Sequence, residues 1–143
     1  MKAGFFLRLI GGKGSGTTAA APQPDIPKIY PVHLVGEQYY PATAHAAEIG
    51  DAVEILAEPD NPFDPDALVV VDARGRTLGY VPRDSWLHEA LLGEGKGCSA
   101  VIEELEADRR GFWNVRIGVT INRDGAIGER GYVPAVHKPR GMR

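Results

Sequence analysis

The segment ALVVVDARGRTLGYVP, residues 67–82, constrains the fold of this 143-residue chain more than any other. Residues 67–73 form a nearly continuous apolar run rich in β-branched side chains, which is typical of a strand buried on both faces. The glycine of the next three residues, Arg-Gly-Arg, allows a tight hairpin turn, and residues 77–81 return as a second strand. A chain built around such a hairpin is expected to be mainly β.

The remaining apolar runs predict more short strands and one helix. The strands are expected at residues 29–40 (with a bulge at Gly36), 52–58, 98–108 and 111–121, the last two joined by a turn at 109–111. Pro82 is expected to open a helix with an apolar stripe of Trp86, Leu87, Ala90 and Leu91. Five or six strands and a helix between the fourth and fifth predict a small, partly closed β-barrel.

Composition divides the chain into three parts. Residues 1–28 end in a stretch rich in Gly, Ser, Thr, Ala and Pro and are expected to be a flexible segment and linker. Residues 29–121 are expected to form the folded domain, and residues 122–143, without periodicity, a basic and mobile tail. Arg8 interrupts the apolar run near the N-terminus, and no stretch approaches the ~20 apolar residues of a membrane span.

Charge is distributed unevenly along the sequence. The formal net charge is -3, yet residues 1–30 and 122–143 are both basic while residues 31–121 carry sixteen acidic against seven basic side chains. An acidic body repels a long polyanion, so a broad duplex-binding face is not expected. With Cys98 as the single cysteine, no internal disulfide can form, and we expect a reducing, cytoplasmic location.

Side chains for catalysis are scarce. The three serines lie outside any nucleophile motif, and the four histidines lack metal-ligand spacing. Cys98 is expected to be a small buried side chain. Three carboxylates of the loop at residues 58–66 supply hard oxygen ligands, but the order of a calcium-binding loop is absent. We therefore expect no enzyme and no metal or other cofactor, with a metal-dependent nuclease using Asp60, Asp64 and Asp66 as the weaker alternative.

The loop EPDNPFDPD, residues 58–66, is unusual for its two prolines and its aromatic residue. Asn61 and Asp64 each precede a proline, which favours extended backbone, and both side chains can fold back onto the main chain. A rigid turn explains the prolines. It does not explain Phe63, which must either pack inward or await a partner.

The order of these motifs resembles the HIRAN domain family. In this chain the pieces are Val32–Tyr40 (loosely), Gly50–Val70 with its E-P-D-N-P-F-D loop, and G-Y-V-P-R at Gly79–Arg83. HIRAN modules occur at the N-terminus of certain helicase-like DNA repair proteins and as free-standing bacterial proteins. The resemblance covers residues 29–121 and implies an OB-like six-stranded β-barrel with one or two short helices. It also implies binding of single-stranded DNA at a free 3′ end.

The resemblance implies a set of DNA-binding residues from four parts of the chain: Gln38, Tyr39, Asn61, Phe63, Asp64, Tyr80, Arg83 and Trp113. Asp64 is the position expected to meet the terminal 3′-hydroxyl, because a carboxylate accepts its hydrogen bond and repels a phosphate. Phe63, Tyr39 and Trp113 offer ring faces for stacking, and Arg83 offers a phosphate contact.

This sequence departs from the family pattern at three of these positions. Gln38 stands where the eukaryotic DNA-binding members have an arginine, Phe63 replaces a tyrosine, and Tyr80 stands where a histidine can occur. The leading interpretation is a non-catalytic module for DNA ends in repair or fork processing, working with a helicase or nuclease on the same DNA. The alternative is a protein-interaction or accessory domain that keeps the fold without end binding.

Overall fold

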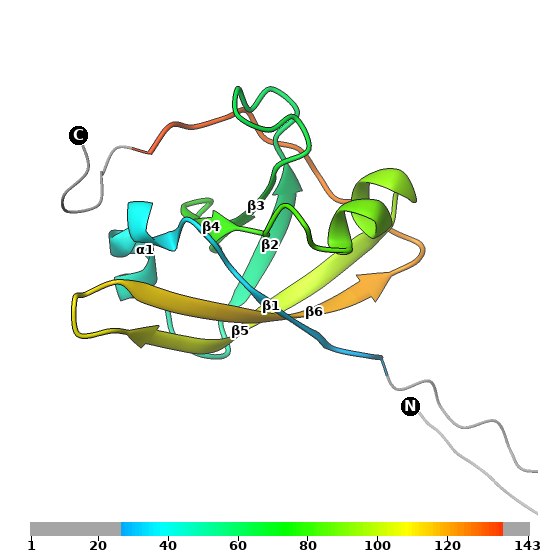
Figure 1. Cartoon of the computed structure of the whole chain (residues 1–143). Helices are drawn as coiled ribbons and strands as arrows, with labels where there is room; N and C mark the ends of the chain where they lie inside the picture. The colour runs from blue at the N-terminus through cyan, green and yellow to red at the C-terminus, as the bar shows by residue number, and fades with distance from the viewer. Residues whose placement is uncertain (1–26, 136–143) are drawn as a thin grey trace, which may run out of the picture.

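The computed structural model describes residues 27–135, which form one curled antiparallel sheet with short helical segments at its ends (Figure 1). The strands are β1 (Tyr30–His33), β2 (Ala52–Ala57), β3 (Leu68–Val71), β4 (Thr77–Tyr80), β5 (Gly97–Ala107) and β6 (Trp113–Asn122). The helical segments are η1 (Glu37–Tyr39), α1 (Pro41–Ala46) and η2 (Glu89–Gly93). The expectation of a mainly β, OB-like fold with six strands and one or two short helices is confirmed.

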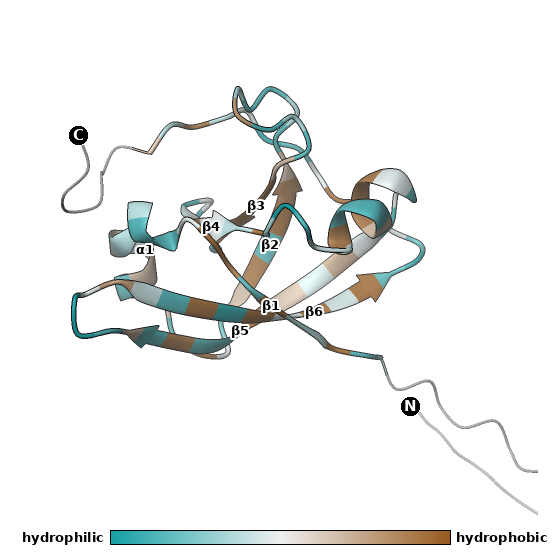
Figure 2. Ribbon diagram, viewed as in Figure 1, coloured by the Kyte–Doolittle hydropathy of each residue, from teal (hydrophilic) through white to brown (hydrophobic). Residues whose placement is uncertain are grey.

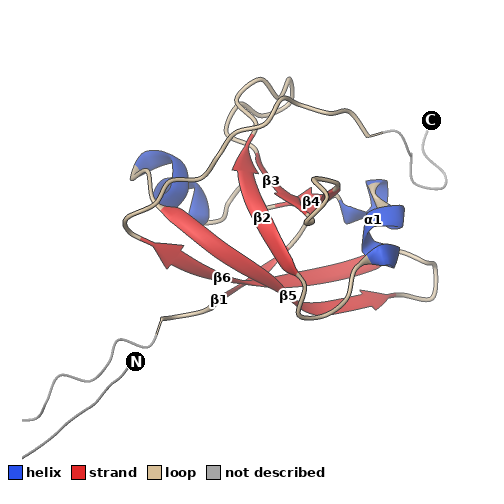
Figure 3. Cartoon of the chain, turned by 180° about the vertical axis from the view of Figure 1, so that it is seen from behind, coloured by secondary structure: helices blue, strands red, loops and turns tan. Residues whose placement is uncertain are grey.

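The sheet curls until its two edges meet. Its strand order is β1-β6-β5-β2-β3-β4, so β1 and β4 are the edge strands. Just beyond β1, Val35 and Tyr80 exchange two backbone hydrogen bonds of 2.9 and 2.8 Å. This single bridge joins the edges and makes the sheet a half-barrel, which is visible from behind in Figure 3.

The predicted hairpin lies at the centre of the core. Leu68, Val69, Val70 and Val71 are at most 2% exposed, as expected for a strand covered on both faces. In Figure 2 the long strands β5 and β6 instead carry alternating hydrophilic and hydrophobic bands, because each has one face on the core. Cys98 packs against the core, partly buried, and burial, with the negative charge of Glu54, raises its thiol pKa to about 11, so the thiol stays protonated at neutral pH.

The first predicted strand is too long. It ends at His33, because Gly36 adopts a left-handed backbone conformation (φ 75°) that turns the chain into η1 and then α1, with Pro41 at the first position of α1. The helix expected from Pro82 begins later. Pro82 accepts a backbone hydrogen bond from Ser85 (3.0 Å) in a turn, and regular helical hydrogen bonding follows only after Trp86.

The described part of the tail is attached to the domain. Ala57 at the end of β2 donates to the carbonyl of Gly128 and accepts from the backbone N–H of Arg130, both at 2.9 Å. The mobility expected from residue 122 is therefore not what residues 122–135 show. Residues 1–26, with most of the expected linker, and residues 136–143 lie outside the described residues, and the domain limits 29–121 stay a prediction.

Glu37 is a buried carboxylic acid beside the junction of the two sheet edges. Its side chain is 7% exposed, and Oε2 accepts a hydrogen bond from the backbone N–H of Val115 at 3.3 Å. Burial raises the pKa of Glu37 above 4.5, against the opposing effects of hydrogen bonds from its own N–H and that of Val115 and of the nearby His33. The charged form of this side chain is therefore disfavoured in the folded protein.

We expect Glu37→Gln to increase the free energy of unfolding at pH 7. A raised folded-state pKa means that the acid contributes fully below the unfolded value of 4.5, and this contribution is lost as the pH rises through the folded pKa. Glutamine keeps an acceptor for Val115 and carries no charge. Urea unfolding at pH 4.5 and 7 measures the effect, with the exposed Glu48→Gln as the control; a loss of equal size at both pH values would contradict it.

Candidate functional site

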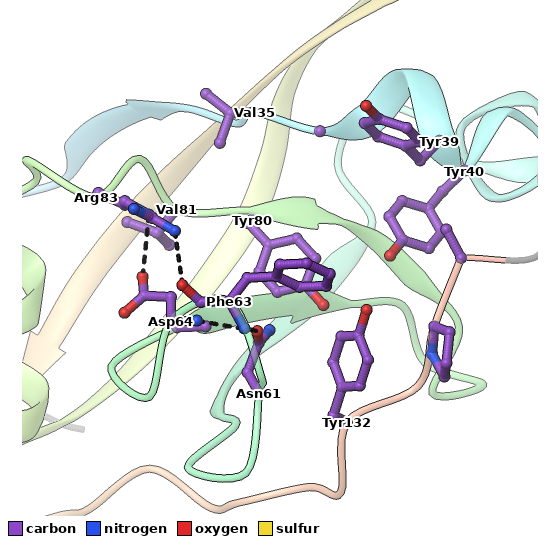
Figure 4. A pocket seen from close by; sticks show the side chains of 14 residues that line it. Val35, Tyr39, Tyr40, Asn61, Phe63, Asp64, Tyr80, Val81, Arg83 and Tyr132 are labelled. Carbon is purple, nitrogen blue, oxygen red and sulfur yellow. Dashed lines mark hydrogen bonds and ion pairs between the residues drawn. The ribbon is translucent and has the colours of Figure 1, made fainter. Parts of the chain in front are cut away.

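A cavity of about 510 Å³ lies where the two sheet edges meet (Figure 4). Its walls come from the Val35–Tyr40 turn, the loop at residues 58–66, the end of β4, and the tail. Five aromatic rings line it, together with one carboxylate and one guanidinium: Tyr39, Tyr40, Phe63, Tyr80, Tyr132, Asp64 and Arg83. This size lies within the range of small-ligand pockets.

Glu58 is the central anchor of the cavity. It is fully buried, and its Oε1 accepts hydrogen bonds from the Asn61 amide (3.0 Å) and the Tyr80 hydroxyl (2.8 Å). Its Oε2 accepts from Arg130 Nε at 2.7 Å, and Arg130 Nη2 lies 2.6 Å away. One carboxylate thereby joins the acidic loop, β4 and the tail, three segments distant in sequence.

The acidic loop is held by the side chain of Asn61. Its Oδ1 accepts the backbone N–H groups of Phe63 (2.8 Å) and Asp64 (3.2 Å), while its amide is engaged by Glu58. This side chain is 8% exposed. Asn61 thus shapes the loop and has little capacity left for a ligand. Phe63, by contrast, is 74% exposed on a backbone fixed from both sides.

Asp64 and Arg83 form an ion pair at the cavity rim. Arg83 Nε lies 3.5 Å from Asp64 Oδ2, and Arg83 Nη2 donates to the carbonyl of Phe63 at 2.9 Å. Asp64 Oδ1 accepts from the backbone N–H of Asp66 at 3.0 Å. The guanidinium is 72% exposed and has further N–H donors, so it can still meet an anion from solvent.

Tyr40 and Tyr80 keep their hydroxyl protons under all ordinary conditions. Burial raises the pKa of both, and the hydrogen bond to Glu58 raises that of Tyr80 further. Their ring centroids are 6.4 Å apart and tilted by 45°. The pair presents apolar ring surface and neutral hydroxyls, which suits a flat, uncharged group better than a phosphate.

The structure brings six of the eight predicted site residues to this cavity: Tyr39, Asn61, Phe63, Asp64, Tyr80 and Arg83. The other two are not among its lining residues. Trp113 packs partly buried against the core, edge-on to His45 at 6.4 Å, and Gln38 is half-buried on η1. A role of all eight in DNA binding stays a prediction.

Sequence reasoning missed Tyr40, Glu58, Arg130 and Tyr132. Tyr40 follows a predicted site tyrosine, and Glu58 opens the quoted loop, so both had a local signal. Arg130 and Tyr132 come from the aperiodic tail, where no pattern marks them. Within residues 27–135 no group of three His, Cys, Asp or Glu side chains is placed to hold a metal ion. No helix in this part of the chain is long and apolar enough to cross a membrane.

The sequence model of the HIRAN domain matches residues 29–124, which is most of the chain. Among curated proteins, none matches significantly. A crystal structure of a protein from Lactobacillus plantarum is similar at TM-score 0.55 and 20% identity, over 68% of this chain and 97% of that one.

Human structures of the same family are also similar to this chain. The crystal structure of the HIRAN domain of human HLTF has TM-score 0.51 and 18% identity, covering 66% of this chain and 74% of that one. The NMR structure of the HLTF HIRAN domain in its DNA-bound conformation has TM-score 0.45 and 18% identity, covering 68% and 77%.

Proposed function

The chain belongs to the HIRAN domain family, and from this we propose that it is a non-catalytic module that binds the 3′-hydroxyl end of single-stranded DNA. The observation that carries the proposal is Phe63, an exposed aromatic ring held on a rigid loop at the mouth of an aromatic cavity. The HLTF HIRAN domain has a DNA-bound conformation, and family membership brings that class of ligand here.

The cavity separates two kinds of contact that a strand end requires. Bases stack on aromatic rings without regard to sequence, each worth about 1–3 kcal/mol. Phe63 and the tyrosines offer such surfaces, and the exposed Arg83 guanidinium lies at the rim, where a phosphate can reach it. A few contacts of this size, less the cost of association, give roughly micromolar binding of one or two nucleotides.

Asp64 has acceptor capacity left for a terminal hydroxyl. An ionised carboxylate has about four lone-pair positions, and Asp66 and Arg83 engage one on each oxygen. A hydroxyl that donates to this charged group contributes about 1.5–3 kcal/mol. A phosphate at the same place would face the negative charge, so the site is expected to favour a free 3′-hydroxyl.

We expect Asp64→Asn to abolish the preference for a 3′-hydroxyl over a 3′-phosphate, because an amide does not repel the phosphate. Fluorescent dT strands of about ten nucleotides with either end, titrated at two salt concentrations, measure it. Asp66→Asn, with an exposed side chain next to the site, is the control. Equal affinity of the unchanged protein for both ends would contradict the proposal.

The acidic charge of residues 31–121 favours the accessory-domain alternative, because it opposes any longer contact with DNA. The titration distinguishes the two functions. Weak binding that is equal for both ends and disappears with salt would place the phosphate contacts in the basic termini. A protein partner, such as a helicase or nuclease acting on the same DNA, would then be the ligand to seek by affinity capture in the presence of nuclease.

A further inference from the structure

Residues 128–135, which we call the strap, lie outside the stretch that matches the HIRAN domain and still form part of the cavity. The family match ends at residue 124. Three strap residues, Tyr132, Pro134 and Ala135, line the cavity. The site of this chain is therefore larger than the family domain alone.

The strap is fixed in place by hydrogen bonds along its length. Gly128 and Arg130 pair with the backbone of Ala57, and the Arg130 side chain binds the buried Glu58. Further along, the backbone N–H of Tyr132 donates to Asp60 Oδ1 at 3.0 Å. Four hydrogen bonds within five residues make the strap a wall of the cavity.

The strap and Arg83 lie on opposite sides of Phe63. Figure 4 shows Arg83 with Asp64 on one side of the Phe63 ring, and Tyr132 on the other. The Tyr132 ring stands edge-on to Phe63, with the centroids 6.2 Å apart and the planes at 68°. A strand whose phosphate meets Arg83 and whose base covers Phe63 would next encounter the strap.

The strap side of the cavity is unsuited to a further phosphate. Pro134 has no backbone N–H to donate, and the guanidinium of Arg130 is already paired with Glu58. The carboxylate of Asp60 lies beneath Tyr132 and adds negative charge there. Arg83 thus favours a phosphate on one side, while the other side offers apolar surface and a carboxylate.

We propose that the strap is an end stop: Tyr132 packs against the terminal nucleotide, and the strap blocks the path of a strand that continues. This inference rests on the proposed binding of a DNA end in the same cavity. It assigns the recognition of an end, as opposed to an internal nucleotide, to residues beyond the family domain. Asp64 then reads the chemistry of the end, and the strap reads that the strand stops.

The test compares linear and circular dT strands of about thirty nucleotides on the full chain. The unchanged protein is expected to prefer the linear strand. Tyr132→Ala is expected to weaken linear binding at least about fivefold and to bring the linear-to-circular ratio toward one, because stacking and the block are both lost. Tyr132→Phe should keep the preference. Val133→Ala, an exposed neighbour absent from the cavity lining, is the matched control.

Each outcome bears on one of the two proposals. If the unchanged protein prefers the linear strand and Tyr132→Ala keeps both that preference and its affinity, the end stop is overturned while end binding stands. If the unchanged protein binds linear and circular strands equally, recognition of an end is itself overturned. Thermal unfolding of Tyr132→Ala verifies that the fold persists, since the Tyr132 contact to Asp60 uses only its backbone N–H.

Discussion

Arg130→Met is expected to lower the free energy of unfolding by about 3–5 kcal/mol, the typical cost of removing one partner from a buried ion pair. Glu58 is fully buried, and Arg130 is its only cationic partner among the described residues, with Nε at 2.7 Å and Nη2 at 2.6 Å. Methionine keeps much of the side-chain volume but leaves the carboxylate without a counter-charge. Urea unfolding followed by circular dichroism measures the change.

The chain offers a matched control and a rescue for this variant. Arg116 pairs with Glu103 (3.4 Å) and Glu104 (3.8 Å), but its side chain is 33% exposed, so Arg116→Met should cost at most about 1 kcal/mol. The double variant Glu58→Gln with Arg130→Met removes both charges and should recover part of the loss. A cost for Arg130→Met no larger than that for Arg116→Met would show that the pair does not hold the strap.

The parts of the fold that were predictable are those whose signal is local. The hairpin from residue 67 to 81 combines a β-branched run with a glycine turn. The structure has β3 and β4 there, with Gly75 at φ 80°. The acidic loop was predictable in the same way, since Asn61 and the two prolines dictate a stiff turn from neighbouring residues alone.

The contacts that were not predictable join residues far apart in sequence. Glu58 and Arg130 are 72 positions apart, and Glu37 and Val115 are 78 apart. No periodicity encodes such a pair. The tail was therefore assigned to a mobile segment, although Arg130 and Tyr132 complete the cavity. Transfer from the family pattern placed Trp113 in the site, but the geometry of this chain directs that ring toward the core and His45.

Phe63→Ala is expected to weaken binding of a 3′-hydroxyl dT strand roughly 5- to 150-fold, the equivalent of about 1–3 kcal/mol for one stacked base. Its ring is 74% exposed, and the loop hydrogen bonds around it use backbone N–H groups and side chains other than its own. The variant should therefore fold normally, within about 0.5 kcal/mol of the unchanged protein. Fluorescence anisotropy and urea unfolding measure the two effects separately.

Two further variants decide what the loss means. Ile49→Ala removes an apolar side chain of similar exposure (65%) that does not line the cavity, and it should leave binding unchanged. Phe63→Tyr restores the residue of the family pattern and keeps the ring, so it should bind at least as well as the unchanged protein. If Phe63→Ala retains full affinity, the exposed ring is not a stacking surface for DNA. An exposed apolar ring held rigidly beside a cation would then indicate a protein partner, because burial of that ring is favourable in either complex.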